Sequence, residues 1–181
     1  MGFEVRGLGK LQKKLDVLPK ILEDAVFSAT TEITEDMQGR IESKLQSSIK
    51  HSSGALTSSF KSEVVKRNDG KVVGRNFSDD IVATIREFGS GLVGQESKKD
   101  LPEGINPQYT QVPWFFPVDS VDVDLTAIYG MPKIKIQGKE FYRTNGQPAR
   151  PFMYPAFKES VEHADEVFKE HVQRNLKKGL K

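Results

Sequence analysis

An apolar repeat with the period of an α-helix dominates the first part of the chain. It covers about residues 18–47 and is interleaved with charged residues. One face of a helix has this spacing of three and four residues. A helix of about 30 residues would be about 45 Å long, so something else, such as a neighbouring subunit, is expected to cover the excess. The repeat consists of Leu22, Ala25, Val26, Ala29, Ile33, Met37, Ile41 and Leu45.

A shorter leucine repeat comes before this helix. Leu8, Leu11, Leu15 and Leu18 keep the same spacing, which predicts one face of a short amphipathic helix. Pro19 follows directly, and proline is tolerated in the first turn of a helix. The proline therefore predicts the start of the longer helix.

The end of the chain predicts another amphipathic helix, from Pro155 to Leu176. Lys177, Lys178 and Lys181 follow it, where positive charge suits the negative end of the helix dipole. Helices are therefore expected at both ends of the chain.

The middle of the chain predicts short antiparallel strands. Asn68-Asp69-Gly70 separates two β-branched runs, which is a hairpin signal. Gln137-Gly138-Lys139 likewise separates the alternating runs 133–136 and 140–143, and the alternation over 121–125 predicts a half-buried strand. The order of elements predicts an α+β fold, in which a long N-terminal helix and a C-terminal helix pack on an antiparallel β-sheet of hairpins.

The length of 181 residues predicts a single domain over 1–181. Residues 81–88 suit either a helix or a strand. The segment after them is rich in Gly, Pro, Ser and Lys and has no period, which predicts a long loop insertion over about 89–113.

Composition excludes several classes of protein. The apolar fraction of 36% is low, which suits a subunit that completes its burial against neighbours. The net charge of +2 gives no overall attraction to nucleic acid. Because cysteine is absent, disulfides and thiolate metal sites are excluded. No signal-peptide core or membrane-length apolar run is found, so a soluble protein made in a cytoplasm is expected.

Candidate catalytic and metal-binding residues are few. His51 lies in a serine-rich segment but has no recognisable nucleophile and orienting acid. His163 and His171 are two helical turns apart, which is not the spacing of a helical metal pair. The acidic group Asp119, Asp122 and Asp124 suits a cation cluster less well than a solvated strand face. No catalytic, cofactor-binding or metal-binding residue is therefore expected.

Three further motifs have structural interpretations. Residues 89–94 match the dinucleotide pattern G-x-G-x-x-G, but without a clean strand and helix around it they indicate a flexible loop. The lysine groups at 10–14, at 98–99 and at the C-terminus are ordinary solvated charges unless a ring of subunits brings them to DNA. The aromatic run 114–116 suits the core or an interface.

Four motifs in order along the chain carry a resemblance. After the long helix come Gly54-Ala55-Leu56-Thr57-Ser58-Ser59-Phe60, then Glu87-Phe88-Gly89-Ser90, then Ala149-Arg150-Pro151-Phe152, and then Pro155-Ala156 before the last helix. This order resembles the HK97 gp10-like family of siphophage neck or tail-completion proteins. The chain departs from the family in a longer segment at about 92–141 and in Ser90, where Thr is frequent.

The resemblance implies a non-enzymatic virion protein that forms a ring at the joint between the capsid connector and the tail. It implies contact with copies of itself (a six-fold ring, with a twelve-fold ring as the second expectation), with a head-completion or connector protein and with tail-terminator or tail-tube proteins. Passive contact with DNA in the channel is a further expectation, and contact with a membrane is not. The protein would be assembled in the bacterial host cytoplasm and located in the virion.

Other functions stay open at this point. A tail terminator or minor tail protein is the nearest alternative, a small nucleic-acid-binding protein is another, and a hydrolase using His51 or the aspartates is a third. The residues expected to form structural or interface contacts are Glu87, Phe88, Gly89, Trp114, Phe115, Arg150, Pro151 and Phe152.

The residues around Arg150 add a physical argument to the resemblance. Pro151 biases Arg150 away from helical backbone angles, and a guanidinium on such a stiff segment can make a bidentate contact with a carboxylate. Glu87 is the candidate partner, in the same subunit or in the next. Equally, Arg150 could bind backbone carbonyls locally where the last helix begins.

Overall fold

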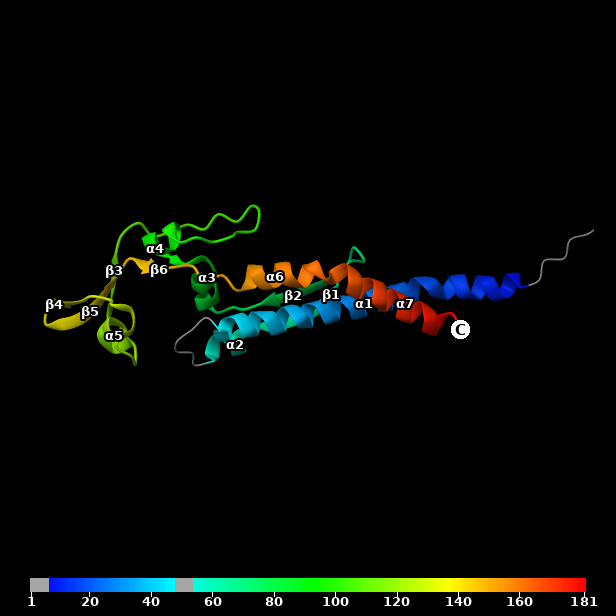
Figure 1. The fold of residues 1–181 in the computed structure, drawn as a ribbon, viewed down its shortest axis with the longest axis horizontal. Helices are drawn as coiled ribbons and strands as arrows, with labels where there is room; N and C mark the ends of the chain where they lie inside the picture. Colours follow the sequence, from blue (N-terminus) through cyan, green and yellow to red (C-terminus); the bar gives the residue numbers. More distant parts are fainter. Residues whose placement is uncertain (1–6, 48–53) are drawn as a thin grey trace, which may run out of the picture. The chain divides into compact units, whose positions relative to one another are not determined.

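The computed structural model describes residues 7–47 and 54–181 (Figure 1). Internal contacts divide the chain into two compact units. Unit 1 comprises Met1–Asp79 and Pro155–Lys181, and unit 2 comprises Asp80–Tyr154. The sequence predicts one domain over 1–181, so the second unit is a finding of the structure.

Unit 1 is built around one long helix, α1. This helix packs against α7 and against a two-stranded antiparallel hairpin of β1 and β2, and α6 begins at the boundary between the units. The elements are α1 Leu8–Ser47, α2 Ala55–Ser59, β1 Lys61–Lys66, β2 Val72–Phe77, α6 Met153–Glu162 and α7 Ala164–Gly179.

Helix α1 is continuous from Leu8 to Ser47 and contains Pro19 in its interior (Figure 1). The prediction of a new helix starting at Pro19 is therefore wrong. Proline removes one backbone hydrogen bond, but the apolar spacing keeps the same phase from Leu18 to Leu22 across it. One continuous face is thus preserved, and the first leucines belong to the same helix as the core residues.

Small residues allow the elements of unit 1 to approach α1 closely. Ala25 and Ala29 are both 0% exposed. On the hairpin side, Gly74 of β2 faces Thr34, which is buried, and Thr34 Oγ1 donates to the carbonyl of Thr30 at 2.7 Å. A Cβ at position 74 would overlap Thr34 Oγ1. The absence of a side chain at Gly74 therefore sets the distance between β2 and α1.

Charged side chains join α1 to α6. Arg40 contacts Asp36 at 2.7 Å and Glu159 at 3.3 Å, and Lys44 contacts Glu159 at 2.6 Å. The hydroxyl of Ser160 donates to Asp36 at 2.8 Å. These contacts fix α6 beside the C-terminal half of α1.

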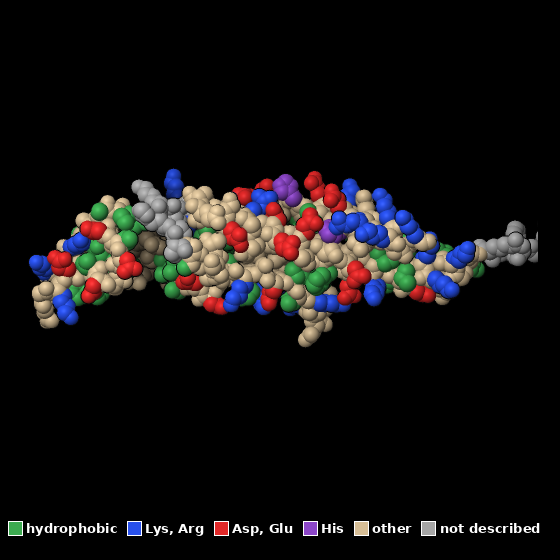
Figure 2. Space-filling view, turned by 90° about the horizontal axis from the view of Figure 1, so that it is seen from below, with side chains coloured by type: hydrophobic (Ala, Val, Ile, Leu, Met, Phe, Trp, Pro, Cys, Tyr) green, Lys and Arg blue, Asp and Glu red, His purple; other side chains and the backbone are tan. Residues whose placement is uncertain are grey.

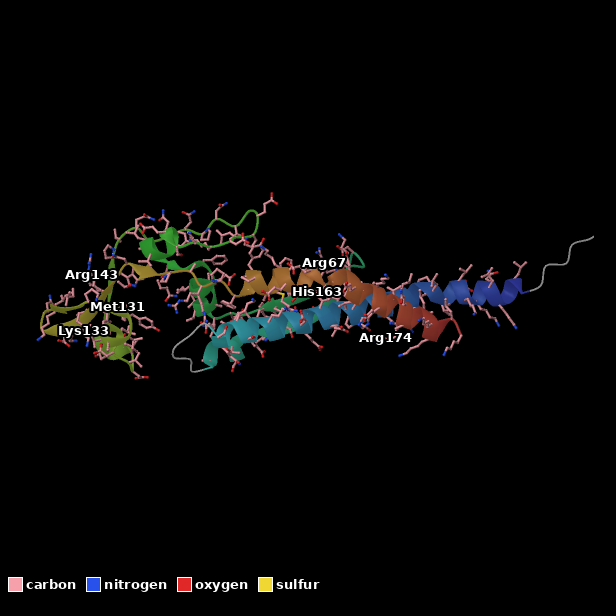
Figure 3. The ribbon with its side chains drawn as sticks, viewed as in Figure 1. Arg67, Met131, Lys133, Arg143, His163 and Arg174 are labelled. Carbon is pink, nitrogen blue, oxygen red and sulfur yellow. The ribbon has the colours of Figure 1, made fainter. Side chains whose placement is uncertain are left out.

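The predicted C-terminal helix is divided into two. Helix α6 ends at Glu162, α7 begins at Ala164, and His163 lies between them (Figure 3). On α7, His171 is buried, and its Nε2 lies 2.8 Å from Glu32 of α1. The predicted helix is therefore interrupted once, at His163, and each of the two helices has its own polar contact with α1.

Unit 2 contains a three-stranded antiparallel sheet in the order β3-β5-β4, flanked by short helices (Figure 1). Arg143 on β5 and Lys133 on β4 belong to this sheet (Figure 3). The elements are α3 Ile81–Phe88, α4 Gly91–Glu96, β3 Trp114–Pro117, the 3-10 helix η1 Val118–Ser120, α5 Leu125–Tyr129, β4 Lys133–Ile136, β5 Lys139–Thr144 and β6 Gly146–Gln147.

The α+β class and both hairpins are confirmed, although the strands form two sheets rather than one.

The segment 81–88 is a helix because the side chain of Asp80 accepts a hydrogen bond from the backbone of Val82, which caps its start. The long loop predicted over 89–113 begins with α4 and is irregular from 97 to 113. No helix among residues 7–47 and 54–181 has the length and apolarity needed to span a bilayer.

The strand predicted over 121–125 is wrong. Residues 121–123 form bends, and Asp124 caps α5 by accepting the backbone N–H of Thr126 at 2.9 Å. An aspartate that can satisfy a helix start offers the backbone an alternative to strand pairing. The helix cap at Asp124 therefore decides the local structure, and the strand indicated by the apolar alternation does not form.

The contact at Gly74 generates a test of this packing. We expect Gly74→Ala to lower the free energy of unfolding by about 1–3 kcal/mol, because Thr34 and its helix must shift. Gly39→Ala is the matched control, since Gly39 lies exposed on α1 with open space around it, and it should raise stability by about 0.5–1 kcal/mol. Urea unfolding of both variants measures the difference. Effects of the same sign would contradict the packing described.

The ion pairs between α1 and α6 generate a pH test. The hydrogen bond from Lys44 holds the pKa of Glu159 below its usual range, and the hydrogen bond from Arg40 does the same for the pKa of Asp36. Both carboxylates therefore stabilise the fold above their unfolded pKa, and this contribution is lost as pH falls through the folded values.

Glu159→Gln should consequently be less stable than the parent at about pH 7, with a smaller difference by about pH 3. Glu162→Gln, an exposed position on the same helix, should show little difference at either pH. Unfolding free energies measured across this range provide the comparison. A Glu159→Gln deficit that does not change with pH would refute the role assigned to the ion pairs.

Candidate functional site

The Glu87 carboxylate is the centre of the candidate site. Glu87 lies on α3 and is 5% exposed. Its Oε2 accepts the backbone N–H groups of Phe152 at 2.7 Å and Met153 at 2.9 Å, and its Oε1 accepts that of Tyr154 at 2.9 Å. One side chain thus satisfies three backbone donors that lie at the start of α6.

This arrangement follows from the physics of helix starts. The first N–H groups of a helix have no partner inside it, and the helix dipole favours a negative charge there. The Glu87 carboxylate on α3 supplies both the hydrogen-bond acceptors and the negative charge that the N–H groups of Phe152, Met153 and Tyr154 favour. Glu87 therefore acts as a helix cap supplied by a segment that is distant in the sequence.

Arg150 does not pair with Glu87 within the chain. Among the described residues no ion pair joins the two, and the Glu87 oxygens accept backbone N–H groups instead. The Arg150 side chain is exposed, while its backbone N–H donates to the carbonyl of Arg86 at 2.8 Å. Of the alternatives left open by the sequence, pairing of Arg150 with Glu87 in the same subunit is therefore wrong, and pairing with a neighbouring subunit stays a prediction.

Arg86 accompanies Glu87 in the interior. It is 6% exposed, and its guanidinium lies 5.7 Å from the ring centroid of Phe152, which is 1% exposed. Burial lowers the pKa of Arg86, and the nearby positive charge of Arg150 lowers it further. The motif Arg150-Pro151-Phe152 thus contributes a backbone anchor at Arg150 and a buried ring at Phe152.

Glycines let two backbone segments meet beside this junction. A Cβ on Gly89 would lie 2.8 Å from the backbone nitrogen of Ala149, and one on Gly94 would lie 3.1 Å from the carbonyl oxygen of Gln147. Gly89 also has φ 79°, a conformation that favours glycine. The pattern G-x-G-x-x-G therefore serves close backbone approach, and not the loop flexibility predicted from the sequence.

Hydroxyl groups complete the same contact. The backbone N–H of Gln147 donates to Ser90 Oγ at 3.2 Å, and that of Ala149 donates to Ser97 Oγ at 2.9 Å. Two of the motifs behind the family resemblance, 87–90 and 149–152, lie side by side in unit 2, because Phe152 donates to Glu87 and Gly89 approaches Ala149.

A cavity of about 540 Å³ opens beside α3. Phe88, Gly89 and Trp114 contribute to its wall, together with the irregular segment 104–110, and the hydroxyl of Tyr109 donates to the Phe88 carbonyl at 3.0 Å. The lining residues include no Asp, Glu, His, Lys or Arg. Such a wall suits packing or binding better than acid–base chemistry.

The aromatic run 114–116 is only half buried. Phe115 is 45% exposed, whereas the ring of Trp114 lies close to Gly91, where a Cβ would be 2.9 Å from it. Phe116 faces Tyr142 across the sheet with ring centroids 5.5 Å apart. The run thus contributes to the core of unit 2 and leaves one ring at the surface.

Asp124, one of the three acidic residues considered for a cation cluster, is engaged in other contacts. Asp124 pairs with Lys133 at 3.1 Å and lies 3.3 Å from the hydroxyl of Tyr142. The hydrogen bond from Lys133 lowers the pKa of Asp124, and the same bond raises the pKa of Lys133. Within residues 7–47 and 54–181, no group of three His, Cys, Asp or Glu is placed to hold a metal ion. His51 lies outside the described residues.

Sequence reasoning missed several residues that build the site. Arg86, Ser97 and Gly94 all contribute to the junction. The glycine spacing was a usable signal for Gly94, because it marks backbone positions that other segments approach closely. Arg86 and Ser97 carried no comparable signal, since their roles depend on contacts with distant segments.

Comparisons of the chain with protein-family models, with curated proteins and with solved structures found no match. The resemblance to the HK97 gp10-like family therefore stays a prediction from the motifs.

The geometry at Glu87 generates a stability test. Glu87→Gln leaves one acceptor oxygen and introduces an amide donor among three N–H groups, so unfolding free energy should fall by about 1–3 kcal/mol. Glu96→Gln, at an exposed position on α4, should change it by less than about 0.5 kcal/mol. Equal stability of the parent and both variants would contradict the capping role.

Proposed function

We propose that the protein is a non-enzymatic structural subunit that assembles into a ring. The observation that carries this proposal is the exposed apolar face at the start of α1. Leu8 is 60% exposed, Leu11 is 55% exposed and Leu15 is 56% exposed. Large apolar side chains in contiguous exposed positions are typical of a surface that another protein covers.

The candidate site supports a structural role. The carboxylate of Glu87, which a hydrolase could use as a base, already accepts three backbone hydrogen bonds. The neighbouring cavity is lined without charged groups. The motif residues are thus used to hold backbone segments together, which is what an assembly component requires.

We further propose that the ring belongs to the head–tail joint of a siphophage or prophage. The motif order that resembles the HK97 gp10-like family supports this assignment, as does the convergence of 87–90 with 149–152. A tail terminator or minor tail protein stays the nearest alternative. Ring partners would then include connector, head-completion and tail-tube proteins.

Nucleic-acid binding is the second candidate function, and one contact favours it. Lys14 donates to the carbonyl of Leu180, which brings the lysines of 10–14 beside those of 177–181. Figure 2 shows Lys and Arg side chains gathered toward the end of unit 1 that holds the start of α1 and the end of α7. In a ring, such a basic end could contact DNA.

The assembly proposal is tested by measuring mass in solution. The purified full-length chain should form a closed ring of identical subunits, visible by electron microscopy and measurable by light scattering over a range of concentrations. Salt-dependent DNA binding by a chain that stays monomeric would instead favour the second candidate.

The location is tested in phage particles. An antibody against the chain should label tailed particles at the joint between head and tail. Labelling along the tail or at its tip would favour the minor tail alternative. Absence of the chain from purified particles would contradict a virion role.

A further inference from the structure

The exposed leucines of α1 continue a face that is buried elsewhere in the same helix. Leu8, Leu11 and Leu15, called here the leucine stripe, keep the spacing of three and four residues that leads through Leu18 and Leu22 to Ala25 and Ala29. Ala25 and Ala29 are 0% exposed. The stripe is therefore an extension of the core-facing side of α1.

The elements that cover this face reach α1 at the C-terminal end of the stripe and beyond it. The last turn of α7 reaches Lys14, whose ammonium binds the Leu180 carbonyl, and the end of β1 reaches Glu23 through Lys66 at 2.5 Å. Beyond these points α1 continues past α7 toward its start (Figure 1). Within the described part of the chain, the stripe stays more than half exposed, whereas Ala25 is completely buried.

The stripe has a basic surrounding. Lys10, Lys13 and Lys14 lie on the same turns of α1, and Asp16 is the one acidic residue between Gly7 and Lys20. Lys10 and Lys13 are exposed and form no ion pair among the described residues. A partner for the stripe should therefore combine an apolar surface with acidic neighbours.

Helix α6 carries such a surface in the same unit. Phe157 is 47% exposed and Val161 is 48% exposed, one helical turn apart; these two residues are called the α6 patch. Glu162, Asp165 and Glu166 follow it closely, are exposed, and form no ion pair in the described part of the chain. The patch thus complements the stripe in both apolarity and charge.

The stripe and the patch lie at opposite ends of unit 1. Helices α6 and α7 run antiparallel to α1, since Glu159 contacts Arg40 and Lys44 whereas Leu180 contacts Lys14. About 30 residues of α1 separate the two regions, which corresponds to about 40 Å. One copy cannot bring its own stripe to its own patch, but two copies can.

We infer that the leucine stripe of one copy docks on the α6 patch of the next copy. The contact joins two different surfaces, so repetition generates a ring or an open filament. The inference rests on the proposed function and specifies its interface. A symmetric contact between two stripes is disfavoured because it would bring the lysines of both copies together.

Single apolar-to-glutamate substitutions separate the two surfaces. Leu11→Glu alters the stripe, Val161→Glu alters the patch, and Val112→Glu is the control at an exposed apolar position in unit 2. Leu11→Glu and Val161→Glu, each measured alone, should have a dissociation constant for self-association at least about tenfold higher than that of the parent. The control Val112→Glu should have the same dissociation constant as the parent. Far-ultraviolet circular dichroism and thermal unfolding establish that each variant remains folded.

Mixing the two variants is the decisive step. Leu11→Glu retains an intact patch and Val161→Glu retains an intact stripe, so an equimolar mixture should form a dimer that does not grow further. Light scattering of the mixture and of each variant measures this. A Val161→Glu variant that assembles like the parent would overturn the inference in favour of a stripe-to-stripe contact or another partner for the stripe.

The remaining outcomes separate the inference from the proposed function. If the parent forms rings and both variants also do, the inference is wrong and the proposed function stands. If the parent stays monomeric at all concentrations, the proposed assembly fails and the inference fails with it. If Leu11→Glu loses binding to DNA while its mass equals that of the parent, the stripe region serves nucleic acid and the inference is overturned.

Discussion

One apolar face of α1 organises unit 1, and residues 7–47 and 54–181 cover that face for only part of its length. Where α7 and the β1–β2 hairpin lie against α1, small residues such as Ala25 and Ala29 are completely buried. Toward the start of the helix the same face continues with Leu11 and Leu15 more than half exposed. Because burial of apolar surface is the main favourable term in folding and association, the uncovered leucines favour contact with another chain.

Unit 2 depends on a different device, the use of side chains to satisfy backbone groups. Glu87 accepts three N–H groups at the start of α6, and the hydroxyls of Ser90 and Ser97 accept two more from the segment before it. Buried backbone donors are costly unless they are paired. The cost of leaving these donors unpaired explains why Glu87, Ser90 and Ser97 are used to hold backbone segments in place.

Sequence reasoning was reliable where the signal was local. The helical period of α1, the Asp69-Gly70 and Gln137-Gly138 turns and the α+β class were all predicted from neighbouring residues. It failed where a distant or competing contact decided the outcome. Pro19 did not break α1 because the apolar phase continues across it, and Asp124 replaced a predicted strand with a helix cap. The partners of Glu87 are backbone groups more than sixty residues away, which no spacing rule identifies.

Hydrogen exchange along α1 tests most directly whether its open face is an assembly surface. The account predicts that amides of residues 11–18 exchange at least about tenfold faster in dilute subunits than in the assembled protein, because the end of a helix that lacks packing opens readily. Amides near Ala25 and Ala29 should be protected in both states, since that part of the face is covered within the chain. Equally fast exchange of residues 11–18 in the dilute and assembled states would contradict the account.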